Sequence, residues 1–139
     1  MRTGVLARRT FTLDDQRAFA ALSGDWNPVH VDPVAARRTI VDGVVVHGVH
    51  LLVWAIGCAC DAPIRIARVK AQWKKPLLVD REVELVCEPG KLVATSGGQR
   101  VLEATLEVMP ASHIAWSGRS WSQEPPLDLS REEAAVARG

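Results

Sequence analysis

Polar and apolar residues alternate through most of the second half of the chain. Over residues 66–75, basic or amide side chains occupy one set of alternate positions, and mostly small or apolar side chains occupy the other. The same period of two recurs over residues 82–88 and 101–108. Turn-forming sequences at 88–91 and 96–99 separate these segments. One-sided alternation of this kind predicts antiparallel strands with one solvated face.

The first half of the chain predicts helices instead. Thr12 and Asp15 form a capping-box pattern, and the helix that they begin is expected to end near Gly24, where glycine permits the backbone to reverse. A second, short helix is expected to run to Ile40, after an Asp-Pro pair at 32–33 that suits an N-cap and a first turn.

Residues 43–64 form the most apolar segment of the chain. Its uninterrupted apolar run covers only residues 51–56, far short of the roughly 20 residues that a bilayer requires. We therefore expect no membrane span. The segment is read as a long helix over residues 48–60 that is apolar on nearly all sides and is wrapped by protein.

The predicted order is one strand, several helices and then about four antiparallel strands, with the long helix packed on the sheet. This is an α+β fold. We expect a single domain over residues 1–122, with one more strand at 113–121, and a polar, loosely docked or mobile tail over residues 123–139.

Composition narrows the function classes. With 47% hydrophobic residues in 139, the chain can bury a core without a disulfide or metal staple. The 17 basic and 16 acidic residues nearly cancel, which argues against a protein built mainly to bind nucleic acid or an anionic membrane. The three cysteines fit neither a disulfide framework nor a zinc site, so a reducing, cytoplasmic location is expected.

The loop after the first helix carries the candidate chemistry. Asp25 and His30 lie five residues apart in a segment shaped by Gly24 and Pro28, so both side chains could point into one cleft and activate a water molecule. Asn27 is expected to bond the loop backbone. From these residues alone, a capped loop with a surface histidine remains the alternative.

The same stretch resembles the signature of the MaoC-like dehydratases, which include (R)-specific enoyl-CoA hydratases. That signature reads aromatic, one or two residues of any type, aliphatic, small, Gly-Asp-x-Asn-Pro, aliphatic, His, and Ala or Ser after five further residues. The positions that meet it are Phe19, Leu22, Ser23, Gly24, Asp25, Asn27, Pro28, Val29, His30 and Ala36.

This resemblance implies a hot-dog fold, in which a curled antiparallel sheet wraps one long central helix and two chains dimerise edge to edge. It implies that Asp25 and His30 form a catalytic dyad, while Ser23, Asn27 and Pro28 shape the loop. The Gly48 N–H would bind the thioester carbonyl. The implied reaction is syn hydration of a trans-2-enoyl thioester, or the reverse dehydration of an (R)-3-hydroxyacyl thioester, on coenzyme A or an acyl carrier protein. No metal or organic cofactor is implied.

Two further features leave alternatives open. A basic stripe that includes Arg68, Lys70, Lys74 and Lys75 is either a solvated strand face or a contact for substrate phosphates or a carrier protein. His47 and His50 share a helix face, where packing or a core hydrogen bond is favoured over metal binding. At the level of the whole protein, a non-catalytic hot-dog partner subunit and a hot-dog thioesterase remain the alternatives to a hydratase.

Overall fold

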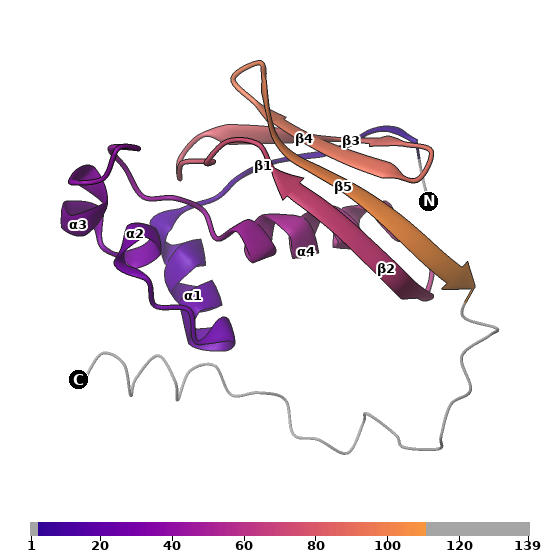
Figure 1. The fold of residues 1–139 in the computed structure, drawn as a ribbon, viewed down its shortest axis with the longest axis horizontal. Helices are drawn as coiled ribbons and strands as arrows, with labels where there is room; N and C mark the ends of the chain where they lie inside the picture. The colour runs from indigo at the N-terminus through magenta and orange to yellow at the C-terminus, as the bar shows by residue number, and fades with distance from the viewer. Residues whose placement is uncertain (1–2, 111–139) are drawn as a thin grey trace.

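The computed structural model describes residues 3–110, which form a five-stranded antiparallel sheet and four helices (Figure 1). The strands lie in the order β1-β3-β4-β5-β2, so β1 and β2 are the two edges. Their bounds are Gly4–Thr10 for β1, Ile64–Trp73 for β2, Glu82–Glu88 for β3, Lys91–Ser96 for β4 and Gln99–Pro110 for β5.

The longest helix, α4, runs along one side of the sheet, and the three other helices gather near its N-terminal end (Figure 1). This is the hot-dog arrangement that the resemblance implies, and it confirms the predicted α+β order of elements. The helix bounds are Leu13–Ser23 for α1, Pro28–Val31 for α2, Pro33–Arg37 for α3 and Gly48–Ala59 for α4.

The core lies between α4 and the sheet. Leu51, Ala55 and Ala59 recur every four residues, which places them on one face of α4, and all three are buried. The alternation predicted for β3 is confirmed, because Val83, Leu85 and Cys87 are buried while the intervening residues are not. Further core residues come from β4 and β5 and the loops, and include Phe11, Val46, Leu77, Leu92, Ala94, Leu102, Ala104 and Leu106.

The helix starts follow the predicted caps. Thr12 and Asp15 exchange the two hydrogen bonds of a capping box at α1. The Asp32 carboxylate accepts two backbone N–H bonds at the start of α3. The expected end of this second helix at Ile40 is wrong, since α3 stops at Arg37. The segment before α3 was expected to be a loop, but residues 28–31 form the short helix α2.

The long helix and β2 are more exposed than the sequence predicts. Val49 and Val53 on the outer face of α4 are 55% and 57% exposed, so residues 3–110 cover only one side of the helix. On β2, a register shift between Ile66 and Arg68 interrupts the predicted alternation, and most of the strand is exposed. The exposure of β2 is consistent with its place at the edge of the sheet, where one side of it pairs with no strand among the described residues.

The expected strand at 113–121, the domain limit at residue 122 and the tail at 123–139 lie outside the described residues. Within residues 3–110, no helix is both long enough and apolar enough to cross a membrane.

Candidate active site at the start of the central helix

Asp25 is held by the turn that ends α1. Gly24 adopts a left-handed conformation with φ of 78°, which lets the chain leave the helix. The Asp25 N–H then donates to the Ser23 hydroxyl oxygen at 3.2 Å, and the Asp25 carboxylate accepts from the Asn27 N–H at 3.2 Å. The Asn27 side chain in turn caps α2 by accepting from the Val29 N–H. The expectation that Asn27 bonds the loop backbone is confirmed, and the carboxylate stays 51% exposed.

His30 lies on α2 and is oriented by a backbone carbonyl. Its Nδ1 lies 2.6 Å from the Val45 carbonyl oxygen. Because that oxygen can only accept, Nδ1 carries a proton, and Nε2 is the nitrogen left for chemistry. The Val45 N–H donates back to the Val29 carbonyl at 2.9 Å, so the segment that orients the ring is itself fixed to α2.

A second histidine, His47, completes the group. It is the N-cap residue of α4, is 2% exposed, and its ring stacks on the His30 ring with centroids 4.0 Å apart. Its Nε2 lies 2.9 Å from the Asp25 carbonyl oxygen and 4.0 Å from an Asp25 carboxylate oxygen. Burial of the ring lowers the pKa of His47, and the neighbouring His30 adds to this, while the hydrogen bond to the Asp25 carbonyl and the charge of the Asp25 carboxylate oppose it.

One carboxylate oxygen of Asp25 and one ring nitrogen each of His30 and His47 lie within 4.8 Å of one another. A water molecule that bridges two groups spans up to about 5.6 Å, so this spacing suits a bound water. The spacing also suits a divalent metal. However, metal binding at His47 would displace a bond that the ring makes to either Gln16 or Asp25.

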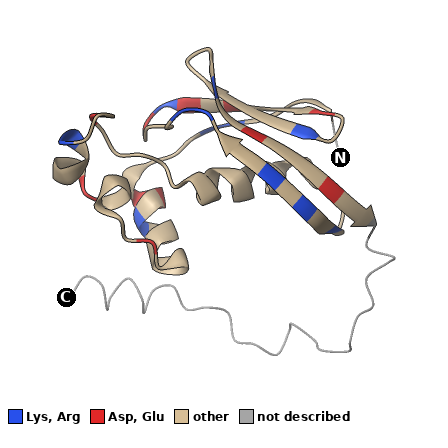
Figure 2. Cartoon of the chain, viewed as in Figure 1, with Lys and Arg blue, Asp and Glu red and all other residues tan. Residues whose placement is uncertain are grey.

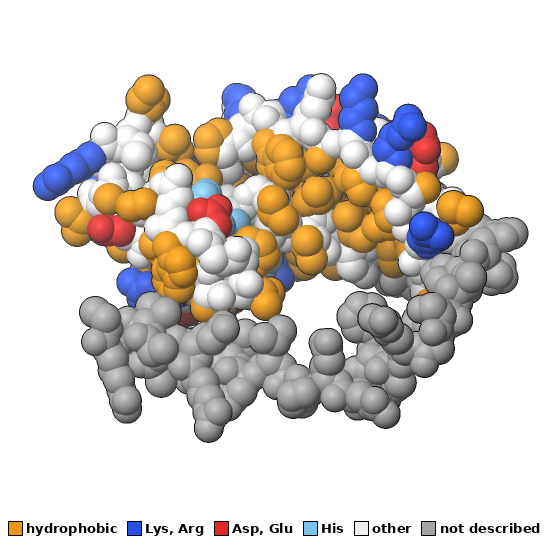
Figure 3. Space-filling model, turned by 60° about the horizontal axis from the view of Figure 1, so that its bottom comes forward, with side chains coloured by type: hydrophobic (Ala, Val, Ile, Leu, Met, Phe, Trp, Pro, Cys, Tyr) orange, Lys and Arg blue, Asp and Glu red, His pale blue; other side chains and the backbone are white. Residues whose placement is uncertain are grey.

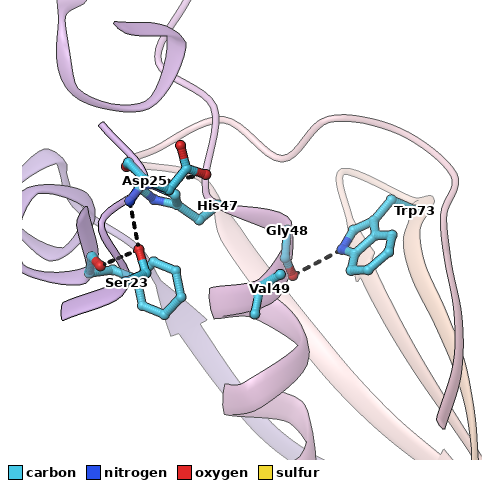
Figure 4. A pocket seen from close by; sticks show the side chains of 7 residues that line it. Ser23, Asp25, His47, Gly48, Val49 and Trp73 are labelled. Carbon is cyan, nitrogen blue, oxygen red and sulfur yellow. Dashed lines mark hydrogen bonds and ion pairs between the residues drawn. The ribbon is translucent and has the colours of Figure 1, made fainter. Parts of the chain in front are cut away.

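Gly48 follows His47 as the first residue of α4 and faces Trp73 of β2 (Figure 4). The Trp73 indole N–H donates to the Gly48 carbonyl at 2.9 Å. A Cβ atom at Gly48 would lie only 2.8 Å from the indole nitrogen, so a larger residue does not fit without moving the ring. Within residues 3–110, no acceptor binds the Gly48 N–H. That donor is therefore available to a ligand.

Two pockets meet at Gly48 and Trp73. The first, about 340 Å³, is lined by Asp25, His47 and Gly48 together with the apolar side chains of Phe19 and Val49. The second, about 280 Å³, contains His30. Its remaining lining residues are Val45, Val46, Gly48, Leu51, Trp73, Lys74, Lys75, Pro76 and Leu77. The structure thus brings the predicted residues Asp25, His30 and Gly48 to adjoining pockets.

The basic stripe is partly neutralised. Arg68 on β2 pairs with Glu107 on β5 at 3.7 Å, and Lys74 pairs with Glu103 at 3.8 Å. Figure 2 shows the resulting bands of opposite charge on these neighbouring strands. Lys70 and Lys75 form no ion pair with any residue that the structure describes. Lys74 and Lys75 line the pocket that contains His30, whereas Arg68 and Lys70 line neither of the two pockets.

Two residues of the site were not predicted from the sequence. His47 was expected to be a packed or hydrogen-bonded core histidine. It is both, but it also contacts Asp25 and His30. Gln16 is fully buried and contacts His47. The sequence does not predict this role, because a glutamine inside a helix has no distinctive local pattern. The one available signal was the position of His47 directly before Gly48.

Known proteins resemble this chain in both sequence and fold. It is 45% identical over 40 residues to a mitochondrial 3-hydroxyacyl-[acyl-carrier-protein] dehydratase of Arabidopsis thaliana, a match that covers 29% of this chain and 24% of the relative. It is 44% identical over 43 residues to the (R)-specific enoyl-CoA hydratase of Aeromonas caviae, covering 31% of this chain and 32% of that protein. The matches therefore span less than a third of these curated relatives.

The structural similarity is broader. The solved structure of the (R)-hydratase from A. caviae involved in PHA biosynthesis aligns with a TM-score of 0.66 and 26% identity, over 78% of this chain and 96% of that one. The sequence model of the MaoC like domain matches residues 3–107, which is most of the chain and contains every residue of the site. The chain belongs to the MaoC-like domain family.

Proposed function

We propose that this protein is a hydro-lyase that adds water reversibly to a trans-2-enoyl thioester, or removes it from an (R)-3-hydroxyacyl thioester. The grouping of Asp25, His30 and the unbonded Gly48 N–H at two adjoining pockets carries the proposal. A carboxylate and an imidazole can exchange protons with water, and a helix N-terminal N–H can stabilise an oxyanion. The partial similarity to a curated dehydratase and a curated hydratase supports the reaction type.

In the proposed hydration, His30 Nε2 takes a proton from a water molecule that Asp25 helps to orient. The water oxygen bonds to C3, and the alkene electrons move through C2 toward the thioester oxygen. The Gly48 N–H stabilises the negative charge on that oxygen. The dyad then returns one proton to C2, so that one water is added overall. His30 has this role because its Nδ1 proton is already committed to the Val45 carbonyl.

The acyl chain and the carrier are proposed to lie on opposite sides of Gly48. The pocket beside Phe19 and Val49 is apolar and suits the acyl chain. The pocket beside Lys74 and Lys75 suits the anionic part of coenzyme A or an acyl carrier protein. Arg68 and Lys70 would contribute to this contact only outside the pockets.

A second copy of the chain is proposed to cover the open face of α4. Val49 and Val53 are exposed there, and the outer edge of β2 pairs with no strand among the described residues. Figure 3, turned to show the underside of the view in Figure 1, shows hydrophobic side chains gathered across this face. An uncovered apolar face beside a free strand edge favours pairing of two chains. We retain residues 1–122 as the proposed domain and 123–139 as its tail.

One assay separates the candidate functions. Purified protein is mixed with short trans-2-enoyl-CoA substrates while the ultraviolet absorbance of the conjugated thioester and the release of free thiol are followed together. Loss of absorbance without thiol release is expected. Thiol release would instead identify a thioesterase. No change with either coenzyme A or carrier-protein substrates would identify a non-catalytic partner subunit.

A further inference from the structure

Gln16 and His47 form a buried polar pair that neither the signature nor the proposed proton transfers account for. Gln16 lies on α1 and is fully buried, and His47 is 2% exposed. The Gln16 side-chain oxygen accepts from the His47 backbone N–H at 2.8 Å and lies 2.9 Å from the ring Nδ1. The two contacts join residues 31 positions apart and hold the His47 backbone and one edge of its ring against α1.

The opposite edge of the His47 ring, at Nε2, faces Asp25. His47 Nε2 lies 2.9 Å from the Asp25 backbone carbonyl, an oxygen that can only accept a hydrogen bond. The Asp25 carboxylate, 4.0 Å away, also favours a proton on Nε2. The Gln16 oxygen that faces Nδ1 is held by the His47 backbone N–H and can also only accept, so a neutral ring can donate to Gln16 or to Asp25 but not to both. The carboxylate on that side favours Nε2 as the nitrogen that keeps its proton when the ring is neutral, and the clamp by Gln16 is then its bond to the His47 backbone N–H.

The same ring fixes the second member of the dyad. His47 and His30 stack with centroids 4.0 Å apart and planes 24° apart. This contact limits how far the His30 ring can tilt about its bond to the Val45 carbonyl. A single buried side chain thus constrains the backbone at Asp25 and the ring plane at His30.

The pair has a cost to stability. The Gln16 side-chain nitrogen is buried with no hydrogen-bond partner among residues 3–110. An unsatisfied buried donor typically destabilises a fold. A hydrophobic residue at position 16 would avoid this penalty but would leave the buried His47 N–H without its acceptor. The two effects oppose each other, so the glutamine brings no plain gain in stability.

We propose that His47, clamped by Gln16, is a positioning residue. It holds Asp25 and His30 in the relative positions that the transfer of water requires. This proposal rests on the proposed function. It predicts that loss of the clamp lowers kcat while binding and folding are kept, because the ligand-binding walls of both pockets remain. A displacement of about 1 Å in a reacting group can cost about 100-fold in rate, so a loss of about 10- to 100-fold in kcat is expected.

The test compares Gln16→Met, Gln16→Glu and a control, His50→Leu. Methionine has a similar length but no acceptor oxygen, whereas glutamate keeps one. His50 is also a part-buried histidine of α4, but its ring stacks on Phe19 and does not contact Asp25. We expect Gln16→Met to lose about 10- to 100-fold in kcat with KM changed less than about two-fold. The Tm should stay within a few degrees of wild type, because removal of the unpaired Gln16 nitrogen offsets the loss of the acceptor for the His47 N–H. Gln16→Glu should recover much of the rate, and His50→Leu should keep the wild-type rate.

Histidine ring NMR with ¹⁵N labelling supplies a readout that does not depend on turnover. In the wild-type protein, a proton on His47 Nε2 is expected, and Gln16→Met should shift the ring signals of both His47 and His30. Wild-type kcat in Gln16→Met, a parallel fall in Tm and kcat, or an unprotonated Nε2 would each overturn the proposal. If the wild-type protein hydrates no enoyl thioester, the proposed function fails, and the NMR result still decides whether His47 is clamped as described.

Discussion

Replacing Gly48 with alanine adds one methyl group at the point where the two pockets meet. The added Cβ would lie 2.8 Å from the Trp73 indole nitrogen and 3.0–3.2 Å from two of its carbons. The indole must then move, because these distances are shorter than van der Waals contact. Its hydrogen bond to the Gly48 carbonyl, now 2.9 Å, would be lost with it.

The expected effect on stability is small. Loss of one hydrogen bond costs about 0.5–1.5 kcal/mol, and Trp73 is 47% exposed, so the indole can swing toward solvent. Exchange of glycine for alanine in a helix returns about 0.5–1 kcal/mol. The net change in the free energy of unfolding is therefore expected to stay within about 1 kcal/mol.

The expected effect on activity is large. The methyl group and the displaced indole would crowd the Gly48 N–H, and loss of one oxyanion donor typically lowers kcat by about 10²–10³-fold. Gly57→Ala is the matched control, because the same exchange on the same helix meets no atom within 4 Å. Thermal unfolding and enoyl-CoA hydration would be measured for both variants. A Gly48→Ala protein that keeps the wild-type kcat would refute the role of this donor.

Four further predictions concern stability and assembly. His50→Leu should raise the Tm by a few degrees, because it removes a buried Nδ1 that has no partner among the described residues; an unchanged or lower Tm would argue against it. Asp32→Ala should lower the free energy of unfolding by about 0.5–2 kcal/mol in urea titrations, because the carboxylate caps α3 with two bonds; no loss would contradict the cap's contribution. Burial lowers the pKa values of His47 and His50 from 6.5, so the unfolded chain binds protons that the folded chain does not. Stability should therefore be full above pH 6.5 and fall as the pH drops through the lowered values, with a shallower fall in His50→Leu. The proposed pairing over α4 predicts that the wild-type protein has the mass of a dimer in light scattering and that Val53→Asp has the mass of a monomer; an equal mass for both would contradict an interface at this face.

Local signals in the sequence predicted the elements well. The capping box at Thr12 and the carboxylate cap at Asp32 each involve residues no more than three positions apart, so their hydrogen bonds can be inferred from the sequence alone. Alternation predicted the buried face of β3 for the same reason. The end of α3 was placed too far along, since residues 38–40 carry no strong stop signal.

Contacts between residues far apart in the chain could not be predicted from the sequence. The apolar pattern of α4 shows that the helix avoids water, but it does not reveal that Val49 and Val53 face away from this chain's own core. Asp25 and His30 were found because they belong to a compact motif. The contact between Gln16 and His47 joins residues 31 positions apart. Neither the residue types nor their local sequence indicates that the two side chains meet. The sequence predicted Asp25 and His30 as a pair, and the structure places the ring of His47 beside both of them.

The most direct test of the account compares the hydration rate of trans-2-enoyl-CoA by the wild-type protein with the rates of Asp25→Asn and His30→Ala. General acid–base groups typically contribute about 10²–10⁴-fold, so each variant should lose at least that much in kcat. Circular dichroism and Tm would confirm that both variants remain folded. Rates near wild type in either folded variant would contradict the assignment of water transfer to this pair.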